Sequence, residues 1–340
     1  MGLWVKKFMR STPNSSEAPA SVPLAAVELC SKKPPKGTFI QKADAAQEIG
    51  LMVRDLRAVD PSFRSQAAAI LPRQSGIIIH LAHVRVIVLA DRVLAFDPTN
   101  PAVEYFLPKL QRRLDAPSHP MPFEFRAIEA VLVEVVSTFN ARIGTLIPSL
   151  DLVLDTLSTT QDFGGDTVQN CMDRLLPLEN ALNEFGAKVA QTRAALNEVL
   201  VSDEDMSLMY ISTFKETGIR RRIDQHDEVE MMLENYMKQI DTVHSEVTSA
   251  LQAVKATENA TQIRLDAMRN RVLRLDIFLN LGAVSVGVGG LVAGVFGMNL
   301  LSGIEEDPAA FWIVSGISFL TSIMFFRGIL AFLRMRRIFY

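Results

Sequence analysis

Two long apolar runs near the C-terminal end constrain the fold of this chain most strongly. Residues 277–298 contain one strongly polar side chain, Asn280, and residues 311–333 are interrupted only by Arg327. As a helix, a run of about 22 residues covers about 33 Å, enough to cross a hydrocarbon core of about 30 Å. Trp312, at the opening of the second run, suits a membrane interface. The runs therefore predict a transmembrane hairpin rather than two buried core helices.

Charged residues flank the two runs asymmetrically. Arginines precede the first run and follow the second: Arg264, Arg269, Arg271 and Arg274, then Arg334, Arg336 and Arg337. The connecting loop, residues 300–309, has no Lys or Arg and carries Glu305, Glu306 and Asp307. The positive-inside rule then predicts both chain ends and the soluble region on the inner side, with the loop outside. The three acids are expected to concentrate cations near the loop, although an ordinary solvated loop explains them equally well.

The first apolar run differs from a simple membrane anchor in its glycine content. Its glycines are Gly282, Gly287, Gly289, Gly290, Gly294 and Gly297. Residues 290–294 form a GxxxG pattern, which is typical of closely packed membrane helices. Since glycine lowers helix stability, its repeated use indicates close approach between backbones. We expect this helix to pack around something rather than to lie alone in lipid.

The region before the hairpin reads as short strands followed by long helices. Apolar runs separated by turn residues predict strands at 69–71, 76–81, 84–90 and 93–96, after a short helix at 45–56. Helical spacing then predicts amphipathic helices at 125–157 and 167–200. A further helix from about 221 to 298 would have roughly 75 residues and span about 110 Å. Such a helix must pack in a bundle, project as a stalk, or both.

The N-terminal segment predicts a leader. Residues 1–16 hold Lys6, Lys7 and Arg10 and no acid, which resembles a mitochondrial transit peptide; a disordered arm is the alternative. Five prolines predict a flexible lead-in over residues 11–36. The predicted organisation is a leader at 1–37, a soluble α/β and helical domain at 38–275, and the transmembrane hairpin at 276–340.

Composition excludes several functional classes. The net charge of −3 gives no electrostatic case for nucleic-acid binding. Two cysteines without a CxxC pattern predict neither a disulfide framework nor a zinc site. His80 and His83 are spaced to lie on opposite faces of a strand, so structural roles are favoured over a shared metal. No nucleophile–base pair, Walker loop or catalytic metal motif occurs, so neither an enzyme nor a bound cofactor is expected.

Four short motifs together point to a family. Gly297-Met298-Asn299 ends the glycine-rich run, directly before the acidic loop. The other stretches are RDLR at 54–57, PFEFRAIEA at 122–130 and EVEMMLENY at 228–236. With these motifs the chain resembles the CorA superfamily of magnesium transporters, and within it the eukaryotic branch typified by the mitochondrial magnesium channel. The resemblance covers about residues 45–337.

The resemblance implies an α+β membrane protein that assembles as a homopentamer. Each subunit would contribute an inner-side α/β domain, a stalk helix that continues into the pore helix, and one helix of an outer ring. Asn299 would form the selectivity filter with Gly297 and Met298, holding Mg²⁺ through its first-shell water. Transported Mg²⁺ and regulatory Mg²⁺ are then the implied ions, and the mitochondrial inner membrane, with both termini in the matrix, is the implied location.

Counting back from Asn299 at 100° per residue indicates a pore wall. Four aliphatic residues fall within about 40° of its face: Leu281, Val288, Val292 and Val295. Such a wall suits a hydrophobic gate. Arg274 lies on the same stripe at the inner mouth, and Asp276 lies on a different face. The family often carries an acidic ring further down this helix, which makes Asp266 a candidate inner cation site.

A membrane potential suffices as the driving force. A divalent ion gains roughly 4.6 kcal/mol on crossing 100 mV. The resemblance also implies feedback by inner Mg²⁺. Its carboxylates are expected among Asp203, Glu204 and Asp205, or among Asp224, Asp227 and Glu228, where a solvated helix face is the alternative. Two other functions stay open: a less selective divalent cation channel and a membrane-anchored helical scaffold.

Overall fold

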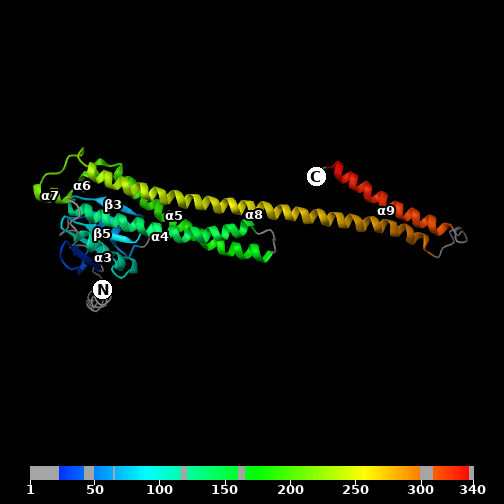
Figure 1. The fold of residues 1–340 in the computed structure, drawn as a ribbon, viewed down its shortest axis with the longest axis horizontal. Coiled ribbons are helices and arrows are strands. Elements are labelled where there is room, and N and C mark those ends of the chain that lie inside the picture. Colours follow the sequence, from blue (N-terminus) through cyan, green and yellow to red (C-terminus); the bar gives the residue numbers. More distant parts are fainter. Residues whose placement is uncertain are drawn as a thin grey trace. The chain divides into compact units, whose positions relative to one another are not determined.

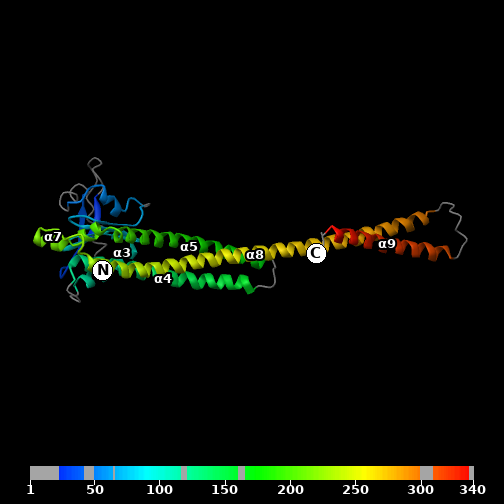
Figure 2. The same ribbon diagram turned by 90° about the horizontal axis from the view of Figure 1, so that it is seen from above.

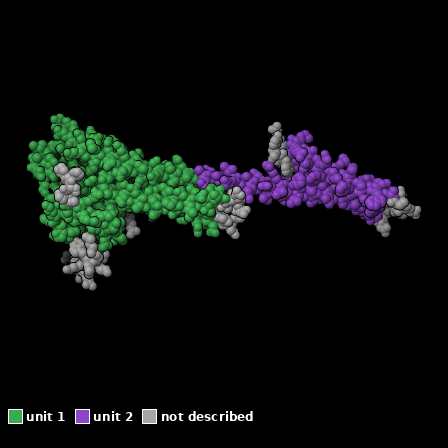
Figure 3. Space-filling model, in the orientation of Figure 1, with its two compact units in different colours: residues 1–255 green, residues 256–340 purple. Residues whose placement is uncertain are grey.

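The computed structural model describes residues 23–41, 50–63, 66–115, 121–159, 165–298 and 309–336. The chain divides into two compact units, Met1–Lys255 and Ala256–Tyr340 (Figure 3). The first unit holds the strands and most of the helices, and the second holds the two C-terminal apolar segments. Residues 1–22, on which the transit-peptide prediction rests, lie outside the described part.

The first unit is built on a six-stranded antiparallel sheet. Its spatial order is β2-β1-β6-β5-β4-β3. The strands are β1 (Leu24–Cys30), β2 (Lys36–Ile40), β3 (Ala69–Pro72), β4 (Ile77–Leu81), β5 (Val84–Val88) and β6 (Arg92–Phe96). The predicted strands in β3 to β6 are confirmed, because each is a short β-branched run bounded by turn residues.

The prediction of a flexible lead-in up to residue 36 was wrong over β1. This strand lies inside the sheet between β2 and β6, with Val27 paired to Gly37 and to Ala95. Its Ala26 and Leu29 side chains are fully buried. The prolines at 23 and 34 flank the strand instead of interrupting it, so they remove no ladder hydrogen bond. Pairing with β2 and with the distant strand β6 explains why this segment is a strand.

The helix predicted at residues 45–56 is not present where that segment is described. Residues 50–54 are not helical, and a single 3₁₀ turn, η1, follows at Asp55–Val59. Residues 42–49 lie outside the described part. Gly50 adopts a φ of 71°, a left-handed conformation that interrupts a right-handed helix.

Seven described helices, long and short, follow the sheet in sequence. They are α3 (Pro101–Asp115), α4 (Phe123–Thr159), α5 (Gly165–Leu200), α6 (Asp203–Leu208), α7 (Ile211–Thr217), α8 (Asp227–Phe296) and α9 (Ala310–Met335). Within the first unit, α4, α5 and the start of α8 lie side by side (Figures 1 and 2). The predictions of α4 and α5 are confirmed, and the predicted continuous helix is confirmed as the 70-residue α8.

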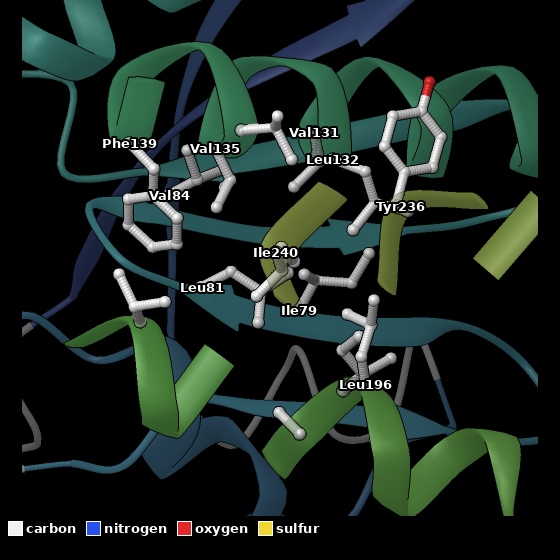
Figure 4. Packing of buried hydrophobic residues seen from close by; sticks show 14 of the residues in the cluster. Ile79, Leu81, Val84, Val131, Leu132, Val135, Phe139, Leu196, Tyr236 and Ile240 are labelled. Carbon is white, nitrogen blue, oxygen red and sulfur yellow. The ribbon is translucent and has the colours of Figure 1, made fainter. Parts of the chain in front are cut away.

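Two hydrophobic clusters cover the two faces of the sheet. Along β4, Ile77 and Ile79 face the helices, whereas Ile78 belongs to a smaller cluster beneath η1. This alternation follows from the period of two in a strand. Side chains from the sheet, α4, α5 and α8 converge on the larger cluster, as Leu81, Val135 and Ile240 show (Figure 4).

The first part of α8 packs against the sheet domain through one stripe. Its buried residues recur at spacings of three and four, and finally of seven: Val229, Leu233, Tyr236, Ile240, Val243, Val247 and Val254. This spacing keeps one face of a helix against a partner over many turns. The stripe belongs to the core of the first unit.

Three helices of the described chain are long and apolar enough to cross a membrane: α4, α8 and α9. Half of the apolar window of α4 is buried within the structure, against 17% for α8 and 6% for α9. The apolar face of α4 is already used by the sheet and by α5. The apolar segments that remain exposed, and so are able to contact a bilayer, are those of the predicted hairpin in α8 and α9.

Candidate ion-conducting hairpin

In the second unit, the C-terminal part of α8 packs against α9 through small residues. The Ser318 hydroxyl on α9 donates to the Gly289 carbonyl on α8. A Cβ added to Gly289 would lie 2.0 Å from the Ser322 hydroxyl and 2.9 Å from the Ser318 carbonyl. Only glycine therefore permits this approach of the two backbones. Towards the inner end, Phe278 and Phe326 meet edge to face at 5.5 Å between ring centroids.

The buried residues of this part of α8 show which face meets α9. Leu281, Ser285 and Gly289 recur at intervals of four, so they form one stripe. The contacts at Phe278 and Gly289 lie on the same side, within about 40° of Ser285 at 100° per residue. The Ser285 hydroxyl donates to the Leu281 carbonyl at 2.7 Å. Its polar group is thus satisfied without water, as lipid requires.

The opposite face of α8 is lined by small residues and carries one acid. It lies about 140–180° from Ser285 and consists of Asp276, Asn280, Ala283, Gly287, Gly290 and Gly294, all exposed in the single chain. The three glycines have open space where a Cβ would stand. This face has no partner within the described chain, which distinguishes it from the stripe that packs on α9.

The residues predicted as the pore wall lie beside the α9 contact. Leu281 is buried, Val288 and Val292 are half-buried, and Val295 is exposed. They lie within about 20–80° of Ser285 by helical spacing. At the inner end, Asp266, Arg274 and Asp276 are all exposed; Arg274 lies on the α9 side and Asp276 on the opposite side.

The predicted selectivity filter begins where α8 ends. The helix stops at Phe296, and the Gly297 N–H still bonds the Ala293 carbonyl at 3.0 Å. Gly297 and Met298 are exposed at this end. Asn299 lies outside the described residues, as do the loop acids Glu305, Glu306 and Asp307. Their roles stay predictions.

Two of the family-like stretches each contribute a buried carboxylate that accepts hydrogen bonds within the soluble domain. In RDLR, the buried Asp55 accepts a hydrogen bond from Arg73 Nε at 2.9 Å. In PFEFRAIEA, the fully buried Glu124 accepts from the backbone N–H and the hydroxyl of Ser212, at 3.1 and 2.6 Å. These carboxylates join η1 to the residue that follows β3, and α4 to α7. Sequence reasoning missed both pairs, because the partners stand 18 and 88 residues away.

The third stretch, at the start of α8, also serves the core. Its Val229 and Leu233 are fully buried, and the Tyr236 hydroxyl donates to Glu129 on α4 at 3.4 Å. Burial, followed by the nearby Glu129 charge, raises the pKa of Tyr236 to about 12. The tyrosine therefore stays protonated and able to donate at any physiological pH.

The described residues contain no group of three or more His, Cys, Asp and Glu side chains able to hold a metal ion. Among the carboxylates considered for feedback, Asp203 lies 3.7 Å from Nε2 of the buried His226. Asp224 pairs instead with Arg222 at 3.1 Å. Groups from a second subunit would be needed to complete a Mg²⁺ site here, so this site stays a prediction.

His80 and His83 are placed as structural histidines. His80 is 5% exposed, and His83 is half-buried at the turn between β4 and β5. Burial lowers the pKa of both, and the neighbouring Arg85 charge lowers that of His80 further. A cleft of about 450 Å³ beside α5 is lined in part by His80, Arg85 and Lys188. Both rings are therefore neutral at physiological pH.

Comparison with known proteins decides the family. The sequence profile described as "Magnesium transporter MRS2-like" matches residues 32–269, well over half of the chain. The chain belongs to the MRS2-like magnesium transporter family. Family membership places it among ion transporters rather than enzymes. The resemblance read from the motifs is thereby confirmed.

MRS2-like relatives match along most of the chain. The mitochondrial inner membrane magnesium transporter mrs2 of Schizosaccharomyces pombe is 35% identical over 310 residues, covering 88% of this chain and 71% of that protein. The transporter LPE10 of Yarrowia lipolytica is 31% identical, covering 86% of this chain and 65% of that protein. A chloroplastic magnesium transporter of Arabidopsis thaliana is 28% identical, covering 88% and 68%. The chain thus spans from about two thirds to 71% of these relatives.

A solved structure shows the same fold. The CorA magnesium transporter of Methanocaldococcus jannaschii superposes with a TM-score of 0.57 at 12% identity, covering 88% of this chain and 95% of that one. The MRS2-like chain therefore has a CorA-like fold: a soluble α/β domain, long helices and C-terminal apolar helices. The predicted fold class is confirmed at this level.

Proposed function

We propose that this MRS2-like chain is one subunit of a homopentameric Mg²⁺ channel of the mitochondrial inner membrane. The observation that carries the proposal is the glycine-rich end of α8, which precedes the Gly297-Met298-Asn299 motif in sequence and leaves one face without a partner in the described chain. Family membership supplies the ion, since the relatives are magnesium transporters. Several copies of α8 arranged around an axis would turn that face towards the centre of the assembly.

The proposed filter is a ring of Asn299 amides. Mg²⁺ keeps its first-shell water tightly and demands octahedral oxygen geometry. Neutral amide oxygens accept hydrogen bonds from that water without binding the ion too strongly for release. Gly297 would let the chain bend at the outer mouth, and Met298 would pack there in the assembled channel. The loop acids Glu305, Glu306 and Asp307 would concentrate cations at this entrance.

The hairpin favours a different pore face from the one counted back from Asn299. If α9 forms the outer ring, the side of α8 opposite Ser285 must face the axis. That side carries Asp276 at its inner end and Gly287, Gly290 and Gly294 above it. The stripe through Leu281 and Val292 then lies between α9 and the neighbouring subunit. The count back from Asn299 assumes that the helix continues to residue 299, whereas α8 ends at Phe296.

The flanking charges predict the direction of cation transport, and the names of the relatives indicate the membrane. The arginine-flanked ends predict the soluble domain in the matrix, where an inside-negative potential pulls a divalent cation inward. Relatives are named for the mitochondrial inner membrane, and one for the chloroplast. Inner Mg²⁺ held between carboxylates of adjacent subunits, with Asp266 on the inner part of α8 as a further site, would provide feedback.

The amide is tested by Asn299→Ala. The purified chain is reconstituted in liposomes carrying an inside-negative potential, and Mg²⁺ entry is read with an internal indicator. Asn299→Ala should abolish uptake while the oligomer stays intact in size-exclusion chromatography. Asn259→Ala is the matched control, because Asn259 is an exposed amide on α8 outside the apolar run. Uptake that survives in Asn299→Ala would refute the proposed filter.

The two alternatives are separated in the same liposomes. Competition with Ca²⁺, Co²⁺, Ni²⁺ and Zn²⁺ distinguishes a selective channel from a general divalent channel. A helical scaffold with an inert anchor predicts no uptake by the unmodified chain. Flux therefore separates scaffold from channel, and competition then sets selectivity.

A further inference from the structure

Three arginines lie on the facing sides of α8 and α9 at the inner end of the hairpin, without an acidic partner among the described residues. On α8, Arg274 and Arg271 lie about 20° and 40° from Ser285 by helical spacing, so they share the side that meets α9. On α9, Arg336 lies about 40° from Ser322, the corresponding position on the side that meets α8. We call these three residues the arginine cluster. All three are exposed.

The cluster occupies one layer along the two helices. The Phe278–Phe326 contact fixes how α8 and α9 are aligned. From that contact, Arg274 and Arg271 lie about 6 and 10 Å down α8, and Arg336 lies about 15 Å down α9. The Arg336 N–H bonds the Phe332 carbonyl at 3.1 Å, so helical geometry still holds there. The three guanidinium groups thus belong to a band about 9 Å deep.

The acids of this segment point elsewhere. Asp276 lies about 180° from Ser285 and Asp266 about 100° from it. Within the described hairpin, no ion pair is formed by the arginine cluster; Arg336 only stacks over Phe332 at 5.7 Å. Like charges gathered on facing sides of two helices repel one another unless an anion lies between them. The arrangement therefore calls for a negatively charged ligand.

The position of the band identifies the chemistry of that ligand. The hydrocarbon runs end at residues 277 and 333, and Arg274 and Arg336 each follow three residues beyond, about 5 Å. Lipid headgroups begin at this depth outside the hydrocarbon core. Figure 1 shows α9 diverging from α8 towards its C-terminal end, and the exposed Phe332 and Met335 supply apolar surface there. An anion with acyl chains fits such a place better than a soluble one.

We propose that the arginine cluster binds the phosphate headgroup of an anionic phospholipid between α8 and α9. Guanidinium groups hold phosphate oxygens through paired hydrogen bonds, which an ammonium group cannot reproduce. Basic pockets between membrane helices on the inner side are suited to anionic headgroups. The role of Arg274 is then to hold lipid on the outer side of α8, away from the cation path. This inference requires the hairpin to span the bilayer, but not a particular transported ion.

The test measures lipid retention, independently of flux. The full chain is purified from phosphatidylcholine membranes with and without phosphatidylglycerol, and the lipid bound per subunit is counted by native mass spectrometry. The unmodified chain should retain phosphatidylglycerol in preference to phosphatidylcholine. Arg274→Gln combined with Arg336→Gln should weaken that retention about fivefold for each arginine removed. The Lys replacements at both positions should restore part of it.

Arg269→Gln is the matched control. It removes the same charge from the same helix, but Arg269 lies about 160° from Ser285 and faces away from α9. Its retention of phosphatidylglycerol should match that of the unmodified chain, and equal Tm values in phosphatidylcholine show that the variants fold.

Three results would overturn the inference. They are equal retention of both lipids, an equal loss in Arg269→Gln, and displacement of the lipid by millimolar inorganic phosphate, which would assign the cluster to a soluble anion. None of these results bears on the Asn299 filter, which is tested by flux.

Discussion

At the scale of single residues, neighbouring glycines of the hairpin have different surroundings. Gly289 touches α9 so closely that a methyl group would lie 2.0 Å from the Ser322 hydroxyl. Gly290, the next residue, faces open space. Both positions are glycines at nearly the same depth in the helix, yet only Gly289 is constrained by contacts within the subunit. Adjacent glycines in this helix therefore have different physical roles.

This difference gives a matched prediction. Gly289→Ala should lower the free energy of unfolding by about 1–3 kcal/mol, because the added methyl overpacks the contact with α9. Gly290→Ala should leave stability equal or slightly higher, since alanine favours the helix. Thermal denaturation of the full chain in detergent measures both. Equal Tm values for the two variants would contradict the described contact, and Ser322→Gly should partly rescue Gly289→Ala.

At the scale of elements, α8 changes partner along its length. Its first part presents an apolar stripe to α4, α5 and the sheet, whereas its last part presents small residues to α9 and a glycine-rich face to open space. The same helix thus serves a water-excluding core and a lipid-embedded contact. Burial of large aliphatic groups stabilises the first, and close backbone approach stabilises the second.

Core packing of the first part is tested by truncation. Ile240 is fully buried, so Ile240→Ala should lower the free energy of unfolding by about 2–5 kcal/mol. Met231 on the same helix is 73% exposed, and Met231→Ala should change it by no more than about 0.5 kcal/mol. Denaturant unfolding followed by circular dichroism measures both. A large loss for Met231→Ala would mean that another surface covers it.

The pore face is tested by thiol accessibility. Cys30 and Cys171 are free thiols, so both are first replaced by Ala. A charged thiol reagent should then block Mg²⁺ uptake through Gly290→Cys, which faces the axis in the proposed channel. Val292→Cys should resist block, because it lies beside α9. The reverse result would restore the stripe counted back from Asn299.

At the scale of the whole molecule, acid should weaken the soluble domain. The pKa of His80 is lowered in the folded protein by burial and by Arg85, from an ordinary value of 6.5. The unfolded chain therefore takes up the proton first, so the free energy of unfolding falls as pH drops below about 6.5, by up to about 1.4 kcal/mol per pH unit. Thermal unfolding at pH 7.5 and 5.5 measures the loss. His80→Gln should make the profile flatter, and an unchanged profile would contradict a buried neutral His80.

The parts of this fold that local pattern controls were predictable. Strands β3 to β6, helices α4 and α5, and the two membrane segments each satisfy a period or a length within their own residues. The filter motif and the arginine flanks are likewise local. Such features follow from backbone geometry and from the thickness of a bilayer, which are the same in every protein.

What required the tertiary structure was the partner of each face. Periodicity shows that Leu281, Ser285 and Gly289 share a side of α8, but not that α9 covers it. In the same way, β1 is a strand because β6 lies beside it, and Asp55 is buried because Arg73 neutralises it. The sequence by itself determined a membrane hairpin, a long helix and a family. Only the folded chain decided which surfaces meet, because those contacts join residues far apart whose pairing no local rule encodes.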